Sequence, residues 1–316
     1  MSASPSQSDA SSHAVGDDED MSAHEVDISS QSSASSSSQA SIYNPMEDLE
    51  GMSYSQEDTV RAFRDYYAFL AKMYVDESLI INPPSGGWPS ITKERYRGMG
   101  KTDVVIELLR HLPYLDEFSG DFLAVQTAPY TTFWNFVLGC NGSGKEAEST
   151  KLYTEGPQFT DSIPAHVIGL SSGENDPLLF LLDTQFGVIY WIEAPGYVKD
   201  NDGSNPSFIS PISNDPYDWA PEHEADWRHE PCWSVADFFT LLKQLCLQLK
   251  HVPLKPQQVV YVWASPSSWY MSLVPPVQDV YRQHGWPDVD NFRKEKCQAA
   301  IKALLAAREE AEDARE

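Results

Sequence analysis

The first sixty residues contain no lysine and no arginine, which limits how this part of the chain can fold. They hold 12 of the 47 acidic residues, and 16 serines lie within the first 42 positions. Such a segment has too few apolar side chains to offset the loss of chain entropy on folding. We therefore expect a disordered acidic tail over residues 1–54, a globular domain over residues 55–289 and a charged C-terminal helix over residues 290–316.

The charge of the chain argues against several kinds of partner. The formal net charge is −25, and the residues after position 60 carry all 22 basic residues but also 35 of the 47 acidic ones. A surface this negative repels phosphate backbones and anionic headgroups, so we expect neither nucleic acid nor a membrane as a partner. A protein with a basic surface is the better electrostatic match, and the oligomeric state stays open.

The cysteines and the apolar runs indicate the compartment. No CxxC pair occurs among the four cysteines, which are Cys140, Cys232, Cys246 and Cys297. The N-terminus lacks the basic flank and apolar core of a signal peptide, and no apolar run approaches the ~18 residues of a membrane helix. We expect free thiols in a reducing compartment, either the cytoplasm or the nucleus.

Three segments have apolar side chains at the three- and four-residue spacings of amphipathic helices. The first covers residues 56–76 and the second residues 103–112, with Ser55 and Thr102 as their N-caps. The third helix is capped by Ser234, and its apolar stripe consists of Val235, Phe238, Leu242, Leu245 and Leu249.

Between the second and third helices, short apolar or alternating runs bounded by turn formers predict strands. These runs are Phe133–Leu138, His166–Leu170, Leu178–Leu182 and Val188–Ile192. The segment Asp183–Gly187 favours a hairpin turn with its glycine at a positive φ. A further strand is expected at Val259–Trp263, and Asp290 or Asn291 is the expected cap of the final helix. This order predicts an α+β fold with a central mixed or antiparallel sheet and helices packed against it.

The segment Gly139–Lys145 has the glycine and lysine spacing of a phosphate-binding P-loop. However, Glu146 stands where the motif needs a hydroxyl for Mg²⁺, and its charge repels phosphate. The following residues, 147–152, do not begin an apolar helix whose N-terminal dipole could hold the anion. We interpret the segment as a solvated turn and keep a nucleotide-using enzyme as an alternative.

Metal-binding residue types gather in the acidic segment 199–231, which we predict to be a long hydrated loop. His223 and His229 are six residues apart, whereas a helical zinc motif needs a spacing of four. Cys232 lacks the second cysteine of a zinc deaminase, because Val235 occupies that place. We therefore expect no metal, no other cofactor and no catalytic residues, with a hydrolase built on these histidines as the alternative.

Several tryptophans lie beside proline, glycine or acidic residues of expected loops, where aromatic side chains often bind partners. The candidate partner-binding residues are Trp88, Trp191, Trp219 and Trp227. The alternative is that each indole fills the edge of the core beneath its loop.

Three motifs together resemble the SUKH superfamily, which contains fungal regulators of cell-wall glucan synthesis and bacterial toxin-immunity proteins. They are Gly86–Pro89, the hairpin segment Leu178–Trp191 and the helix segment Trp233–Leu242. The resemblance covers residues 56–250, and the chain is similar to fungal proteins that carry this domain behind a serine-rich tail. It implies a non-enzymatic α+β domain for protein interaction or regulation, and it assigns no catalytic residue.

Overall fold

The folded part of the chain begins before the expected boundary after residue 54. In this computed structural model the described residues are 44, 46–116, 124–139, 144–173, 177–199, 208–262 and 269–313. A short helix, α1 (Glu47–Glu50), contributes Leu49 to the same buried cluster as Val188 and Trp227. The compact unit therefore comprises Asn44–Glu316, and residues 1–43 of the expected tail lie outside the described residues.

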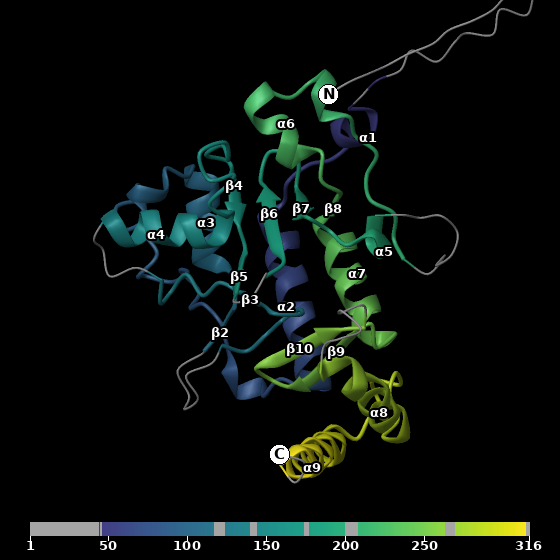
Figure 1. The fold of residues 1–316 in the computed structure, drawn as a ribbon. Helices are drawn as coiled ribbons and strands as arrows, with labels where there is room; N and C mark the ends of the chain where they lie inside the picture. Colours follow the sequence, from purple (N-terminus) through teal and green to yellow (C-terminus); the bar gives the residue numbers. More distant parts are fainter. Residues whose placement is uncertain are drawn as a thin grey trace, which may run out of the picture. The chain divides into compact units, whose positions relative to one another are not determined.

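A four-stranded antiparallel sheet forms the centre of this unit (Figure 1). Its strands, in spatial order, are β4 (Val167–Gly169), β6 (Leu179–Asp183), β7 (Val188–Ile192) and β8 (Cys232–Ser234). β6 and β7 form the expected hairpin, whose open end pairs Leu179 with Ile192. Gly187 in its turn has φ +72°, and a Cβ there would lie 2.6 Å from the Ser53 carbonyl oxygen.

Three two-stranded antiparallel ladders surround the central sheet. They are β1 (Ile80–Ile81) with β2 (Tyr114–Leu115), β3 (Thr131–Phe133) with β5 (Ser171–Gly173), and β9 (His251–Lys255) with β10 (Gln258–Tyr261). Together with the helices, these ladders confirm the α+β class. Every ladder among the described residues is antiparallel.

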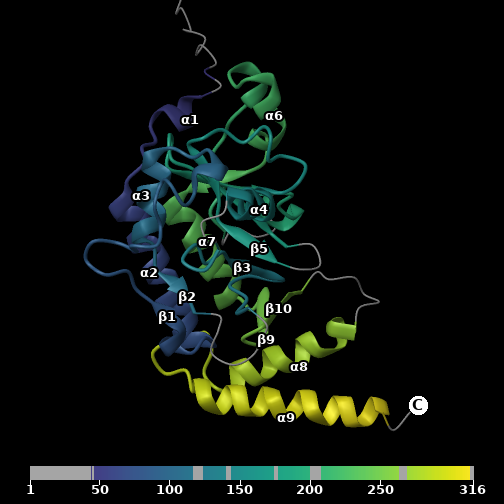
Figure 2. The ribbon, with the colours of Figure 1, turned by 90° about the vertical axis from the view of Figure 1, so that its left-hand side faces the viewer.

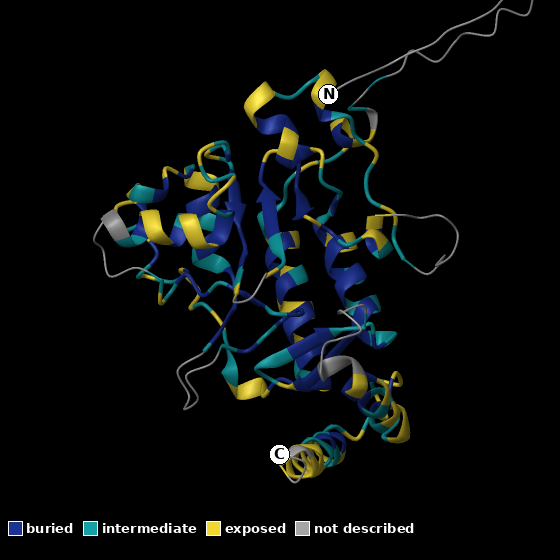
Figure 3. Ribbon diagram, viewed as in Figure 1, coloured by how far each residue is buried: buried dark blue, intermediate teal, exposed yellow. Residues whose placement is uncertain are grey.

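Two long helices, α2 (Gln56–Met73) and α7 (Val235–Leu247), pack side by side against the sheet (Figure 1). Their predicted N-caps are confirmed, because the Ser55 and Ser234 hydroxyls accept backbone N–H groups of the first turns at 3.2 and 3.0 Å. Figure 3 shows that both helices bury the faces that meet the sheet. The rings of Phe63 and Phe239 join the two helices, with centroids 4.7 Å apart.

The other helices lie at the periphery of the sheet. The predicted cap Thr102 precedes α3 (Asp103–His111), and its hydroxyl accepts a backbone N–H at 3.4 Å. α8 (Trp269–Gln283) and α9 (Lys294–Asp313) lie side by side and contact β9 (Figure 2). The remaining helical segments are α4 (Gly144–Glu155), α5 (Gly196–Lys199), α6 (Glu222–Arg228), and the short η1 (Glu77–Leu79), η2 (Arg97–Met99) and η3 (Pro216–Asp218).

Some predicted boundaries are wrong, for local reasons. The strand expected over Phe133–Leu138 ends at Phe133, because the Asn135 side chain accepts the Val137 N–H and turns the chain. The final helix begins at Lys294, since the residues expected to cap it form a turn in which Asp288 bonds Asn291. Such side-chain hydrogen bonds compete locally with regular structure.

His251 is a polar group in the interior that the sequence pattern did not predict. It lies in β9, its exposed fraction is 0%, and its ring packs edge-on against Trp191 at 6.4 Å. Neither ring nitrogen makes a hydrogen bond with any described residue. Burial lowers the pKa of His251 to about 3, so the ring is neutral at physiological pH.

We predict that Phe238→Ala lowers the free energy of unfolding by about 3–5 kcal/mol, through lost burial and an unfilled cavity. Phe238 is fully buried, and its ring meets that of Phe180 at 4.9 Å. The control is Lys243→Ala on the same helix, whose partly exposed ammonium pairs with Asp65 and should contribute less than about 1 kcal/mol. Urea melts measure both, and equal small losses would contradict this packing of α7.

We also predict that His251→Leu removes an acid sensitivity of the fold. The folded-state pKa lies below the ordinary value of 6.5, so wild type loses stability as pH falls from about 6.5 towards 3. The slope is at most about 1.4 kcal/mol per pH unit. Urea melts of both proteins at pH 7, 6 and 5 measure this difference. Parallel pH profiles would contradict the prediction.

Candidate functional site

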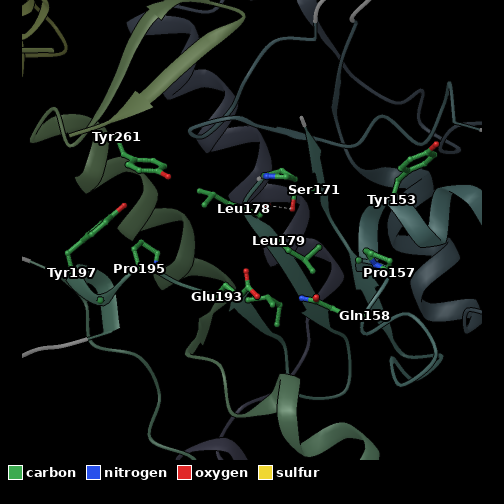
Figure 4. Close-up of a pocket in the computed structure, with 14 residues that line it drawn as sticks. Tyr153, Pro157, Gln158, Ser171, Leu178, Leu179, Glu193, Pro195, Tyr197 and Tyr261 are labelled. Atoms are coloured by element: carbon green, nitrogen blue, oxygen red, sulfur yellow. Dashed lines mark hydrogen bonds between the residues drawn. The ribbon is translucent and has the colours of Figure 1, made fainter. Parts of the chain in front are cut away.

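A cleft of about 610 Å³ opens beside the central sheet, at the open end of the β6–β7 hairpin (Figure 4). Its floor contains Leu178, which precedes β6, and Ser171 of β5. Tyr197 of α5 and Tyr261 of β10 lie on one side, and Tyr153 of α4 lies on the other. We call it the tyrosine cleft, and its lining residues are Tyr153, Gly156, Pro157, Gln158, Ser171, Pro177, Leu178, Leu179, Ile192, Glu193, Pro195, Gly196, Tyr197 and Tyr261.

Backbone strain accompanies the cleft. The chain leaves β7 at Glu193, which has φ +53°, and then enters α5 through Pro195 and Gly196. Tyr130 has φ +57°, and its ring packs edge-on against Tyr261 at 5.6 Å. Non-glycine residues rarely adopt the left-handed region, and such strained conformations cluster at functional sites.

The tyrosine side of the cleft is polar but uncharged. Burial raises the pKa of the Tyr197 hydroxyl, and the neighbouring Tyr261 raises it further. Tyr197 therefore stays protonated at neutral pH, so its hydroxyl can both donate and accept a hydrogen bond. This side offers flat aromatic faces together with hydroxyl groups.

The opposite side is held in place by contacts of α4. The Tyr153 ring stacks on Trp134, with centroids 6.2 Å apart and planes 19° apart. The Thr150 hydroxyl donates to the Gly139 carbonyl oxygen at 3.0 Å. At the end of the helix, the buried Glu155 carboxylate lies 2.6 Å from the Lys101 ammonium. Contacts from the segment of Trp134 and Gly139 and from Lys101 thus hold this side in place.

The charge of the cleft is negative. Among the described residues that line it, Glu193 carries the single carboxylate, and neither lysine nor arginine is present. A carboxylate beside aromatic rings favours a cationic group, which the faces of the rings also attract. An anionic ligand would be repelled by Glu193 and by the net charge of −25.

The described lining provides little for covalent catalysis. It contains neither histidine nor cysteine. Its serine, Ser171, donates to the Leu178 carbonyl oxygen at 2.8 Å and accepts the Phe180 N–H at 2.9 Å. A nucleophile needs a base within hydrogen-bond reach, and Ser171 instead joins β5 to β6.

The four tryptophans proposed from the sequence do not form one site, and none lines the cleft. Trp191 and Trp227 are fully buried, so neither offers a surface to a partner in this structure. Trp88 and Trp219 are partly buried. Their indole N–H groups donate to the Leu112 carbonyl and the Asn214 side chain, both at 2.9 Å. The contacts of all four indoles are therefore those of side chains that fill the core or its edges.

The expected long loop over residues 199–231 contains helix α6, so that prediction is wrong for residues 222–228. Residues 200–207 lie outside the described part. The helix carries His223, which is exposed, and ends before His229. Within the described residues, no three metal-binding side chains gather into a possible metal site. Cys232 is buried, which raises its pKa to about 12 and leaves the thiol protonated.

Residues 140–143 of the P-loop-like segment lie outside the described part. A helix, α4, begins at Gly144, and it is not an apolar one, as the sequence predicted for residues 147–152. Its inward face consists of small and hydroxylated side chains, namely Ala147, Thr150 and Thr154, rather than large apolar ones. The helix therefore lacks the apolar stripe on which the prediction relied.

Comparison with known proteins yields no relative. The chain matches no model of a protein family, no curated protein and no solved structure. Throughout the described residues, every helix is too short or too polar to cross a membrane. The geometry of the cleft therefore carries the functional interpretation.

The sequence did not reveal the cleft because its tyrosines come from distant positions, 153, 197 and 261. The one local signal is the turn Glu193–Tyr197, in which a proline and a glycine follow a strand and precede an aromatic residue.

The ion pair beneath the cleft predicts a pH effect. Burial raises the pKa of Glu155 to about 7, which the Lys101 ammonium opposes. The folded state then holds a proton that the unfolded state releases above about 4.5, so wild type loses stability as pH rises from 4.5 to 7. Glu155→Gln abolishes this loss, and relative to wild type it gains up to about 3 kcal/mol between pH 4.5 and 8. Urea melts at both pH values measure the difference, and a constant difference would refute the prediction.

Proposed function

We propose that this protein is a non-enzymatic interaction module whose tyrosine cleft binds an extended, proline-containing, positively charged segment of a partner protein. The observation that carries the proposal is the composition of the cleft: tyrosines on two sides and one carboxylate, without a cation in its described lining. The proposal agrees with the resemblance to the SUKH superfamily, which implies protein binding. Leu178 and Leu179, at the start of the hairpin segment that carries this resemblance, line the cleft.

The aromatic sides favour a polyproline II segment. Such a segment is already extended in water and has no internal hydrogen bonds, so little chain entropy is lost on binding. Proline rings pack against flat aromatic faces such as those of the tyrosines. The opening between Tyr153 on one side and Tyr197 and Tyr261 on the other offers such aromatic rings.

The carboxylate favours a lysine or arginine in the same segment. Glu193 lies between the two aromatic sides in Figure 4, so a cation near it would also meet the tyrosine rings. The net charge of −25 would attract a basic partner from a distance, and added salt would weaken that attraction.

We do not propose either enzyme alternative. His223 and His229 are absent from the lining of the cleft, and Ser171 is engaged in backbone hydrogen bonds. Most of the P-loop-like segment lies outside the described residues.

A capped ten-residue peptide with one central lysine flanked by prolines tests the proposal. Its affinity, measured by fluorescence anisotropy, should fall about threefold to tenfold in Glu193→Gln and at least about tenfold in Tyr197→Ala and Tyr261→Ala. A peptide with glutamate in place of lysine should bind more weakly to wild type, as should one with alanines in place of the prolines.

Two control variants separate the cleft from general effects. Tyr217→Ala removes a tyrosine that is 60% exposed on η3, and Glu309→Gln removes an exposed carboxylate on α9. Both should bind the lysine peptide like wild type. Equal affinities across all the variants, or preference for the glutamate peptide, would refute the proposed function.

A further inference from the structure

A second polar side chain, Gln158, points its amide end towards Glu193 in the tyrosine cleft (Figure 4). Gln158 lies in the turn after α4, whereas Glu193 follows β7, so the two side chains enter the cleft from different segments. Within the described part of the chain, neither side chain has a hydrogen bond or an ion pair. A carboxylate and an amide are therefore both available to a ligand in the cleft.

The turn that carries Gln158 is held by backbone contacts. Gly156 has φ +75°, and a Cβ there would lie 3.1 Å from the Leu179 side chain, so the turn passes close to the start of the hairpin. The Gly156 carbonyl oxygen accepts the Thr160 N–H at 3.1 Å. The Lys151 ammonium in turn donates to the Thr160 carbonyl oxygen at 2.7 Å. A side chain on a fixed turn loses less entropy on binding than one on a free loop.

Glu193 also starts from a fixed backbone. It directly follows Ile192, which pairs with Leu179 at the open end of the hairpin. The next residue, Ala194, is buried. The acceptors of Glu193 and Gln158 therefore belong to two segments that are both anchored beside Leu179.

Lysine and arginine use such a pair of acceptors differently. A lysine ammonium is a compact point charge with its three donors on one nitrogen. A guanidinium is planar and has five N–H groups that point in several directions. One edge can pair with the Glu193 carboxylate while another N–H group donates to the Gln158 amide oxygen. The guanidinium is also more weakly hydrated, and its flat faces can stack on tyrosine rings.

We infer that the basic residue of the partner segment is an arginine, and that Gln158 determines this choice by accepting a hydrogen bond from the guanidinium that Glu193 holds. This inference rests on the proposed function and narrows its partner from lysine or arginine to arginine. Glu193 supplies the charge that either cation needs, whereas Gln158 adds an acceptor that the planar cation uses best.

Three capped ten-residue peptides test the inference. They are the proline-flanked lysine peptide and the same peptide with either arginine or citrulline in place of lysine. By fluorescence anisotropy, wild type should bind the arginine peptide about tenfold more tightly than the lysine peptide, because one more hydrogen bond to a charged group forms. Citrulline resembles arginine in shape but has no charge, so its peptide should bind at least about tenfold more weakly than the arginine peptide.

Gln158→Met keeps the length of the side chain and removes its amide oxygen. This variant should lower the preference for arginine over lysine to less than about twofold and leave the affinity of the lysine peptide unchanged. The matched control is Gln185→Met, which replaces an exposed glutamine in the turn at the other end of the hairpin and should keep the preference. Both glutamines are exposed, so both variants should melt at the temperature of wild type.

The failures of the two proposals are distinguishable. Absence of binding by both the lysine and the arginine peptide overturns the proposed function and this inference with it. Equal binding of these two peptides by wild type overturns this inference alone, as does a preference for arginine that persists in Gln158→Met. Equal losses of both peptides in Gln158→Met would assign the amide to the main chain of the ligand or to the shape of the cleft, and would also overturn the inference. Binding of the citrulline peptide as tight as that of the arginine peptide would exclude the pairing with Glu193.

Discussion

The Asp183 carboxylate and the Arg228 guanidinium meet at 2.8 Å in the interior, and Glu224 binds the same guanidinium at 2.7 Å. A buried charge that loses its partner typically costs about 3–5 kcal/mol, so these side chains hold their elements together strongly. Asp183 ends β6, whereas Glu224 and Arg228 lie on α6. The second oxygen of Asp183 accepts the Gln185 N–H at 2.7 Å, which fixes the turn of the hairpin. Rings that surround the guanidinium belong to Phe186, Tyr190, Trp219 and Trp227.

The fixed turn at one end of the hairpin determines the positions of the strand ends at the other. β6 and β7 are paired over their whole length, so their register carries the geometry of the turn to the open end, where Leu179 faces Ile192. The chain enters β6 from the floor of the cleft and leaves β7 at Glu193. The remaining sides come from α4, α5 and β10, which contact neither the turn nor Arg228 through any described hydrogen bond. The hairpin is therefore the fixed element beside which the other sides of the cleft are arranged.

The predictable parts of this fold were those with local signals. Ser55 and Ser234 cap helices whose apolar stripes repeat every three or four residues, and Gly187 is needed by a tight turn. Other elements depend on tertiary contacts that no window of sequence contains. The buried face of α4 is made of an alanine, two threonines and Glu155, and α6 is held by the ion pairs of Arg228. α8 contains Pro275 and Pro276, which usually end a helix. The cleft combines segments that are distant in the sequence, so its tyrosines had no common pattern.

Strain gives a physical reason to regard the cleft as more than a gap in packing. Among the described residues, three non-glycine residues have positive φ, and Glu193 and Tyr130 are both near the cleft. Each costs on the order of 1–3 kcal/mol and persists only where surrounding structure enforces it. At Leu249, the third, a left-handed residue after α7 has an ordinary explanation in helix termination. Glu193 has no such role, because it follows a strand. Its conformation instead places the single carboxylate of the lining between the tyrosine sides, where a cationic ligand would meet it.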